Sequence, residues 1–170
     1  MIMKKYIFSI IALLTMGFAF TSCDPETNEE PGGFKIVDMT GEWLVTVDAV
    51  LGDGTVLEDP YGIGQFSIQT YATTNDDTDK MWLYDGGFWG LQFLVPIDYN
   101  NKTFACKDLP YDLVETGHIT ITNGKVSKDG GLNIHGKPVD AITFDAVFDD
   151  DDSGVACWRY HGVRYQGFTE

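Results

Sequence analysis

Apolar and polar residues alternate along most of this chain, and that alternation limits its fold more than any other feature. From Lys35 onward, apolar residues recur at every second position and helical periodicity is nearly absent. The clearest runs cover residues 43–51, 66–72, 89–97 and 142–148. Because successive side chains of a strand point to opposite faces, a period of two is typical of strands with one buried face. The sequence therefore predicts an all-β domain.

Turn sequences separate these runs at short intervals. Gly52-Asp53-Gly54 follows the first run, Asp85-Gly86-Gly87 indicates a hairpin, and Asn123-Gly124 is the strongest hairpin sequence in the chain. A loop rich in Gly and Asp is expected from Lys128 to Asp140. About eight or nine strands at this spacing, without a convincing helix, favour an antiparallel barrel or sandwich built of hairpins.

The N-terminus has the order of an export signal. Lys4 and Lys5 precede a mostly apolar run, residues 6–20, that is too short to span a bilayer as a helix. The run ends in Phe20-Thr21-Ser22-Cys23, which resembles a bacterial lipobox, where a signal peptidase cuts before a diacylated cysteine. The resemblance implies removal of residues 1–22 and lipid attachment at Cys23. The alternative is an ordinary secretory peptide with a nearby cysteine.

The chain is strongly acidic, with 26 acidic against 11 basic residues and a net charge of −15. Such a charge repels phosphate backbones, so we expect no nucleic-acid partner. It also disfavours a peripheral hold on anionic lipid, and acyl chains on Cys23 would supply the membrane attachment instead.

Residues 24–33 contain no apolar residue apart from proline and glycine. We therefore expect residues 23–34 to form a disordered acidic tether, followed by one domain over residues 35–170. Acidic residues soon after Cys23 resemble the surface-export signals of Bacteroidetes lipoproteins. The expected location is the outer membrane, on its periplasmic face or at the cell surface.

Gly41-Glu42-Trp43, at the start of the first predicted strand, resembles the Gly-X-Trp motif of lipocalin-like proteins. In those folds the Trp caps the closed end of the barrel and stacks beneath an Arg of the final strand. The resemblance implies that Trp43 has this role here, with Arg159 or Arg164 as its partner.

A wider set of segments resembles a family of Bacteroidetes lipoproteins described as lipid-binding, with hydrolase activity also suggested for them. The segments are Tyr61–Gly64, Met81–Leu83, Phe88-Trp89, Ile119–Gly124 and Tyr160–Arg164. The resemblance covers nearly all of residues 40–168. It implies a lipocalin-like, antiparallel up-and-down β-barrel of about eight strands and a lipid-like ligand, and it transfers no catalytic residue.

Aromatic residues are the main candidates for a binding site. The interior of an eight-stranded barrel is just wide enough to be filled by side chains or to hold one small ligand. We expect a pocket for a small apolar or amphipathic ligand, lined by Trp43, Phe66, Trp89, Phe93 and Phe144. The alternative is that these residues simply fill the barrel. A further alternative is an accessory lipoprotein that docks a protein partner through outward Phe88 and Leu94.

No catalytic constellation is evident in the sequence. His118, His135 and His161 are isolated, and no serine lies in a Gly-X-Ser-X-Gly elbow. A triad of His161 with a serine and an aspartate could assemble only in space. An esterase-like hydrolase is therefore a remote alternative, and we expect no cofactor.

Cys106 and Cys157 lie in strand-like segments of an exported chain. A disulfide between them is possible if their strands are neighbours. The alternative is two unpaired, partly buried thiols.

The acidic run near the C-terminus, residues 149–152, resembles part of a calcium-binding loop. Asp149, Asp151 and Ser153 match the first half of an EF-hand loop, but Tyr160 stands where a bidentate Glu is required. A solvated hairpin loop is therefore favoured over a weak calcium site, and we expect no bound metal.

Overall fold

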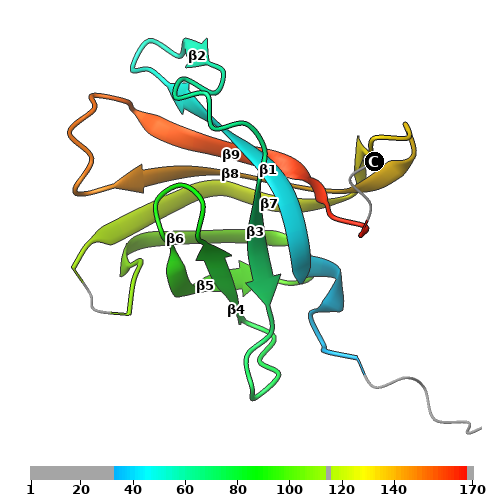
Figure 1. Ribbon diagram of the computed structural model, residues 1–170. Helices are drawn as coiled ribbons and strands as arrows, with labels where there is room; N and C mark the ends of the chain where they lie inside the picture. Colours follow the sequence, from blue (N-terminus) through cyan, green and yellow to red (C-terminus); the bar gives the residue numbers. More distant parts are fainter. Residues whose placement is uncertain (1–32, 114–115, 168–170) are drawn as a thin grey trace, which may run out of the picture. The chain divides into compact units, whose positions relative to one another are not determined.

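Eight antiparallel strands close into a barrel, and a ninth, two-residue strand is attached to the end of the first (Figure 1). The computed structural model describes residues 33–113 and 116–167. A short 3-10 helix, η1 (Val37–Met39), precedes the strands. The strands are β1 (Gly41–Val50), β2 (Val56–Leu57), β3 (Phe66–Tyr71), β4 (Lys80–Asp85), β5 (Gln92–Asp98), β6 (Thr103–Pro110), β7 (His118–Leu132), β8 (Pro138–Phe148) and β9 (Cys157–Arg164).

Pairing of the first strand with the last closes the sheet. Strand β1 pairs with β3 on one side and with β9 on the other, while the two-residue β2 adds only to the far end of β1. The remaining strands each pair with their neighbours in sequence. The all-β class and the antiparallel up-and-down barrel of about eight strands are therefore confirmed.

The alternation seen in the sequence places one face of each strand inside the barrel. On β1 the side chains of Trp43, Val45, Val47 and Ala49 are buried. On β8 the inward positions are Ile142, Phe144, Ala146 and Phe148. Burial of each large side chain stabilises the fold by about 1.5–3 kcal/mol. The core thus lies inside the barrel, and the outer face is left to polar and half-buried residues.

One end of the barrel is closed by η1 and by an arginine. The Arg164 guanidinium lies 4.3 Å above the Trp43 ring and donates to the backbone oxygens of Thr40 and Asp38. At the edge of the ring, Trp43 Nε1 donates to Thr70 Oγ1 at 2.8 Å. Arg159, the other candidate partner of Trp43, instead pairs with Asp145 on the outer face.

The hairpin turn predicted at Asn123-Gly124 is wrong. This dipeptide lies inside β7, where Asn123 has a φ of 56° and the register with β8 shifts between Thr122 and Lys125. A bulge of this kind bends a strand and increases its twist. A side chain on Gly124 would overlap the carbonyl oxygen of Phe104, so the bulge also lets β6 and β7 approach closely.

The expected loop over residues 128–140 is mostly strand. Strand β7 runs on to Leu132 and β8 begins at Pro138, so the connection between them is only residues 133–137. Asn133 Oδ1 accepts hydrogen bonds from the backbone nitrogens of His135 and Lys137 and so fixes this turn. Glycines 130 and 131 pack tightly within the ladder rather than marking a loop.

We predict that Gly162→Ala destabilises the barrel, because its Cβ would overlap the carbonyl oxygen of Leu44 where β1 meets β9. Overpacking of this kind costs about 1–3 kcal/mol. The control is Gly52→Ala, whose added methyl group would meet no atom within 4 Å. Urea titrations of both variants measure the free energy of unfolding, and equal values would contradict the prediction.

Candidate functional site

The five aromatic residues predicted to line a pocket lie in or beside the packed core. Trp43, Phe93 and Phe144 are buried, and Phe144 stacks on Tyr160 with centroids 4.4 Å apart. Phe66 and Trp89 are half-buried. Four concavities lined by described residues measure 170–570 Å³, and none of these four is lined by the predicted five. All five belong to the core or pack against it, and the ring contacts of three of them are with other aromatic residues: Phe66 and Phe144 contact Tyr160, and Trp89 stacks on Phe148.

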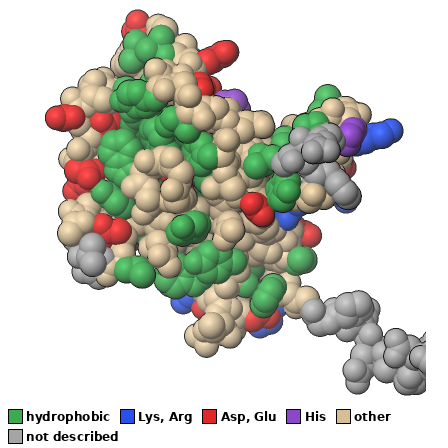
Figure 2. Space-filling view, in the orientation of Figure 1, with side chains coloured by type: hydrophobic (Ala, Val, Ile, Leu, Met, Phe, Trp, Pro, Cys, Tyr) green, Lys and Arg blue, Asp and Glu red, His purple; other side chains and the backbone are tan. Residues whose placement is uncertain are grey.

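The end of the barrel opposite η1 carries a cluster of aromatic rings that grades from buried Trp158 and Phe148 to exposed Tyr61. Phe88 lies 5.0 Å from Trp158 between ring centroids, and Tyr61 stacks on Trp158 at 5.6 Å. Trp89 stacks on Phe148 at 4.2 Å with an interplanar angle of 5°. Figure 2 shows hydrophobic side chains gathered over the loops at this end. Phe88, expected to point outward, therefore packs into an aromatic cover over the barrel.

A buried carboxylate holds this cover in place. Asp85 Oδ1 accepts from the backbone nitrogens of Gly87 and Phe88 at 2.8 and 3.0 Å, and Oδ2 accepts from that of Trp89 at 3.1 Å. The Tyr160 hydroxyl also donates to Oδ2, at 2.9 Å. Burial, together with the Asp85 charge, raises the pKa of Tyr160 well above its usual value. Asp85-Gly86-Gly87 predicted a hairpin here, but no local pattern indicated that the aspartate side chain points inward.

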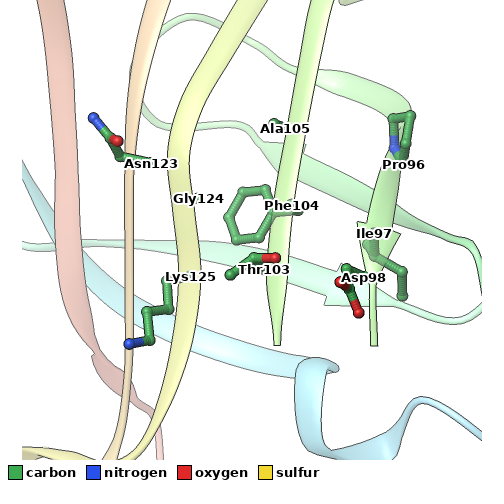
Figure 3. A pocket seen from close by; sticks show the side chains of 9 residues that line it. All are labelled: Pro96, Ile97, Asp98, Thr103, Phe104, Ala105, Asn123, Gly124 and Lys125. Atoms are coloured by element: carbon green, nitrogen blue, oxygen red, sulfur yellow. The ribbon is translucent and has the colours of Figure 1, made fainter. Parts of the chain in front are cut away.

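A cleft of about 570 Å³ lies on the outer wall where β5 and β6 separate (Figure 3). Only two residue pairs join these strands, Ile97↔Phe104 and Asp98↔Thr103. The backbone nitrogen of Ile97 donates toward β4, to Asp79. Because the backbone groups of successive strand residues face opposite neighbours, the nitrogen of Pro96 faces β6, and it has no hydrogen to donate. Pro96 therefore stops the ladder and opens the cleft.

The lining of the cleft is amphipathic. Pro96, Ile97, Phe104 and Ala105 supply apolar surface, Asp98 at the end of β5 supplies a carboxylate, and Lys125 lies on the opposite side, on β7 (Figure 3). Within the described ranges, no carboxylate lies within 4 Å of the Lys125 amino group. Phe104 is almost completely buried and forms the floor. The cleft can therefore accept an apolar chain on one side and a polar or acidic group on the other.

Phe104, the floor of the cleft, faces the core on its inner side. The Phe104 ring lies 5.6 Å from Phe144, one of the five predicted lining residues. A single side chain thus separates the outer cleft from the aromatic interior. The sequence did not predict this site. The early end of the pairing between β5 and β6, and the direction of the Pro96 nitrogen, depend on strand register and not on local pattern.

Comparison with known proteins gives a family. The model of the family described as "Lipid-binding putative hydrolase" matches residues 28–169. The chain belongs to this family. The match confirms the family resemblance and fits a lipid-binding role for the barrel. A comparison with curated proteins finds no match.

Two histidine rings lie beside carboxylates: His118 Nδ1 is 3.4 Å from Asp149 Oδ2, and His161 is hydrogen-bonded to Asp48 on the outer face of β9. The family's description as a putative hydrolase makes the closer pair, that of His161, the one to test as a catalytic dyad. The Nε2 atom of His161 lies 3.0 Å from Asp48 Oδ2 and 3.2 Å from Thr46 Oγ1. A catalytic triad requires the nucleophile and the acid on different ring nitrogens. Here both contacts fall on the same nitrogen, and no serine of the described chain is hydrogen-bonded to a histidine ring.

In this member of the lipid-binding family, Cys106 and Cys157 are free thiols. They lie on β6 and β9, which are not adjacent in the sheet. The condition stated for a disulfide, neighbouring strands, is therefore not met. Burial raises the pKa of both thiols, which keeps them protonated and weakly nucleophilic.

The carboxylates of the acidic run point to different protein groups. Asp149 Oδ1 accepts from the backbone nitrogen of His118 at 2.8 Å, and Asp151 Oδ2 accepts from Trp158 Nε1 at 2.7 Å. Asp151 Oδ1 also accepts from the backbone nitrogen of Ser153. These contacts use oxygens that a calcium ion would need, and among the described residues no group of three or more His, Cys, Asp or Glu is placed to hold a metal.

The predicted signal peptide, Cys23 and most of the predicted tether lie outside the described residues. Within the described parts of the chain, no helix reaches the length and apolarity that a membrane crossing needs.

We predict that the free energy of unfolding of this protein falls at alkaline pH, because Tyr111 and Tyr160 have raised pKa values in the folded state. Burial and the adjacent Asp150 raise the pKa of Tyr111 to about 12, and that of Tyr160 is also raised. Unfolded tyrosines lose their proton near pH 10. Above that pH the unfolded chain binds fewer protons than the folded one, so the free energy of unfolding falls as pH rises.

Urea titrations between pH 8 and pH 12 measure this loss. Tyr111→Phe removes one of the two groups, and we expect a shallower fall above pH 10 than in the unmodified protein. Its stability at pH 8 records the separate cost of losing the hydrogen bond to Asp150. A fall of the same steepness in both proteins would count against the prediction.

Proposed function

We propose that this protein is an exported, lipid-anchored envelope protein that binds a lipid-like amphipathic ligand without converting it chemically. The lipid-binding family supports the ligand class. The observation that carries the proposal is the cleft between β5 and β6, which is open, has an apolar wall of Pro96, Ile97 and Ala105, and is bordered by Lys125 on β7 and Asp98 on β5. The Asp98 carboxylate accepts two hydrogen bonds from Asn101, and Lys125 supplies the positive charge on the opposite side. The volume of the cleft, about 570 Å³, is within the range of small-ligand sites, roughly 300–1,000 Å³.

In this proposal an acyl chain lies against Pro96, Ile97 and Ala105, and an acidic head group lies beside Lys125. Each methylene group taken out of water contributes about 0.8 kcal/mol. The charged contact is exposed and contributes less, about 0–1 kcal/mol. The tail therefore supplies most of the affinity, and Lys125 orients the ligand.

The interior remains part of the proposal. A chain that displaced the Phe104 ring would meet Phe144, and through it the other residues predicted to line the barrel. The aromatic cover at the far end would stay closed, because Asp85 holds its backbone by three hydrogen bonds. We therefore place ligand entry at the wall of the barrel, beside β5.

The proposed absence of catalysis is supported by the outer-face histidine. His161 contacts Asp48 and Thr46 through one nitrogen, an arrangement that does not pass a proton from nucleophile to acid. Incubation with acyl esters of short and long chain tests this part, and turnover lost in His161→Ala would overturn it.

Ligand binding is tested by native mass spectrometry of the protein purified from membranes in mild detergent, and by titration with oleate. We expect a bound lipid, and at least tenfold weaker oleate binding in Ala105→Glu, because a carboxylate then faces the acyl chain. The control is Ala156→Glu, which adds the same charge at another exposed position. No retained lipid together with no oleate binding would refute the proposal.

The anchor is tested separately. We expect Cys23→Ala to release the protein from membranes or to leave the signal peptide uncut, because acyl chains are attached at this thiol. Membrane fractionation and the intact mass of the protein report both results. Membrane-bound, acylated Cys23→Ala protein would defeat this part of the proposal and leave the ligand site untouched.

A further inference from the structure

One part of the barrel's outer surface carries no charge. Strands β3, β4 and β5 are neighbours in the sheet, and every second side chain points outward. In the middle of these strands the outward side chains are Gln69, Tyr71, Trp82, Tyr84, Gln92 and Leu94, which we call the neutral face. Figure 2 shows hydrophobic side chains over β3 and β4 on the side that it views. In a chain with 26 acidic residues, an exposed uncharged face is unusual.

Three aromatic rings of the neutral face lie in adjacent positions. Tyr71 is the cross-strand partner of Trp82, and their rings are nearly parallel, at 16°, with centroids 6.0 Å apart. Tyr84 lies two positions along β4, between its cross-strand partners Gln69 and Gln92. Tyr71 and Tyr84 are 37% and 39% exposed. The face therefore combines accessible rings with two amides, and each amide offers a donor and an acceptor.

The charged groups that border the neutral face already have partners. Glu42, the cross-strand neighbour of Gln69 on β1, accepts a hydrogen bond from the Ser67 hydroxyl at 2.6 Å. Lys80, at the start of β4, lies 3.4 Å from the Asp77 carboxylate. The one cation that borders the face, Lys80, is thus already paired within the described residues, and the net charge of −15 repels anions. These charges disfavour an anionic ligand, and the six uncharged side chains of the face itself match a neutral one.

We infer that the neutral face binds an uncharged saccharide. A pyranose ring presents C–H groups on one flat face, and their slightly positive hydrogens pack on the negative face of an aromatic ring. Sugar hydroxyls both donate and accept, as do the amides of Gln69 and Gln92. A purely apolar partner would bury those amides without hydrogen bonds, which costs about 1–3 kcal/mol for each group. The mixture of rings and amides thus selects a sugar over a lipid tail.

This inference is independent of the proposed lipid site. The neutral face uses Gln92 and Leu94 of β5, whereas the cleft uses Pro96, Ile97 and Asp98 of the same strand. Substitutions on β3 and β4 therefore test the saccharide without touching the cleft, and oleate binding serves as a control for an intact barrel.

The test uses the mature protein in mild detergent and four neutral probes, cellohexaose, maltohexaose, xylohexaose and mannohexaose. Isothermal titration and tryptophan fluorescence measure binding. We expect at least one probe to bind, and Trp82→Ala to weaken that binding at least tenfold. The matched control is Val147→Ala, which removes an exposed apolar side chain from the outer face of β8 and should leave binding unchanged.

Two further variants separate recognition from folding. Trp82→Phe keeps an aromatic ring, so it should retain binding to within about tenfold, and Gln69→Ala should weaken binding without a change in thermal unfolding. Failure of all four probes to bind would overturn the inference, as would binding that Trp82→Ala leaves intact. A dimer in sedimentation that Trp82→Ala dissociates would also overturn it, because a second copy would then cover the face.

Discussion

The pairing of β1 with β9 is the constraint on which the rest of the molecule depends. Eight consecutive residue pairs join the two strands, from Trp43↔Arg164 to Val50↔Cys157, and they convert a meander into a barrel without free edges. Eight strands enclose a space that side chains can fill, and the stacked rings of Phe144 and Tyr160 lie in it. A ligand that enters must displace packed rings, at the cost of a cavity or of strain. Closure thus favours binding on the wall over binding in the centre.

A closed wall offers a cleft only where its ladder is interrupted, and a proline can interrupt it without breaking the barrel. Pro96 removes one donor toward β6 while its neighbours continue to pair with β4. The bulge at Asn123 then tilts β7, and Gly124 lets it approach β6 beside the opening. The two irregularities act together, because the first separates two strands and the second keeps the next strand close enough to line the gap. Buried Asp85 has the opposite effect at the end of the barrel, where it fixes an otherwise open loop.

Much of this architecture could be predicted from the sequence, and the exceptions have a common cause. Alternation identified the strands because each has one buried face, and it also placed Trp43 and Phe144 inside. The hairpin predicted at Asn123-Gly124 was wrong because the backbone preference of this dipeptide suits a hairpin turn and a bulge equally well. The bulge forms because β7 pairs with β6 and with β8 on either side of this point. The cleft and the role of Asp85 depend on which way a backbone nitrogen or a carboxylate faces. That direction is set by register between distant segments, which local pattern does not record.

The acidic character of the chain also acts locally rather than as a whole. Asp145, Asp140 and Asp38 are paired with Arg159, Arg164 and Lys102, so several of the cations neutralise carboxylates on the barrel itself. At physiological ionic strength, exposed charges more than about 8 Å apart are largely screened. A ligand at the cleft therefore responds to Lys125 and Asp98 more than to the net charge, and one at the neutral face meets mainly rings and amides. The same net charge disfavours adsorption of the barrel to anionic membrane surfaces, and the covalent anchor that we propose does not depend on such adsorption.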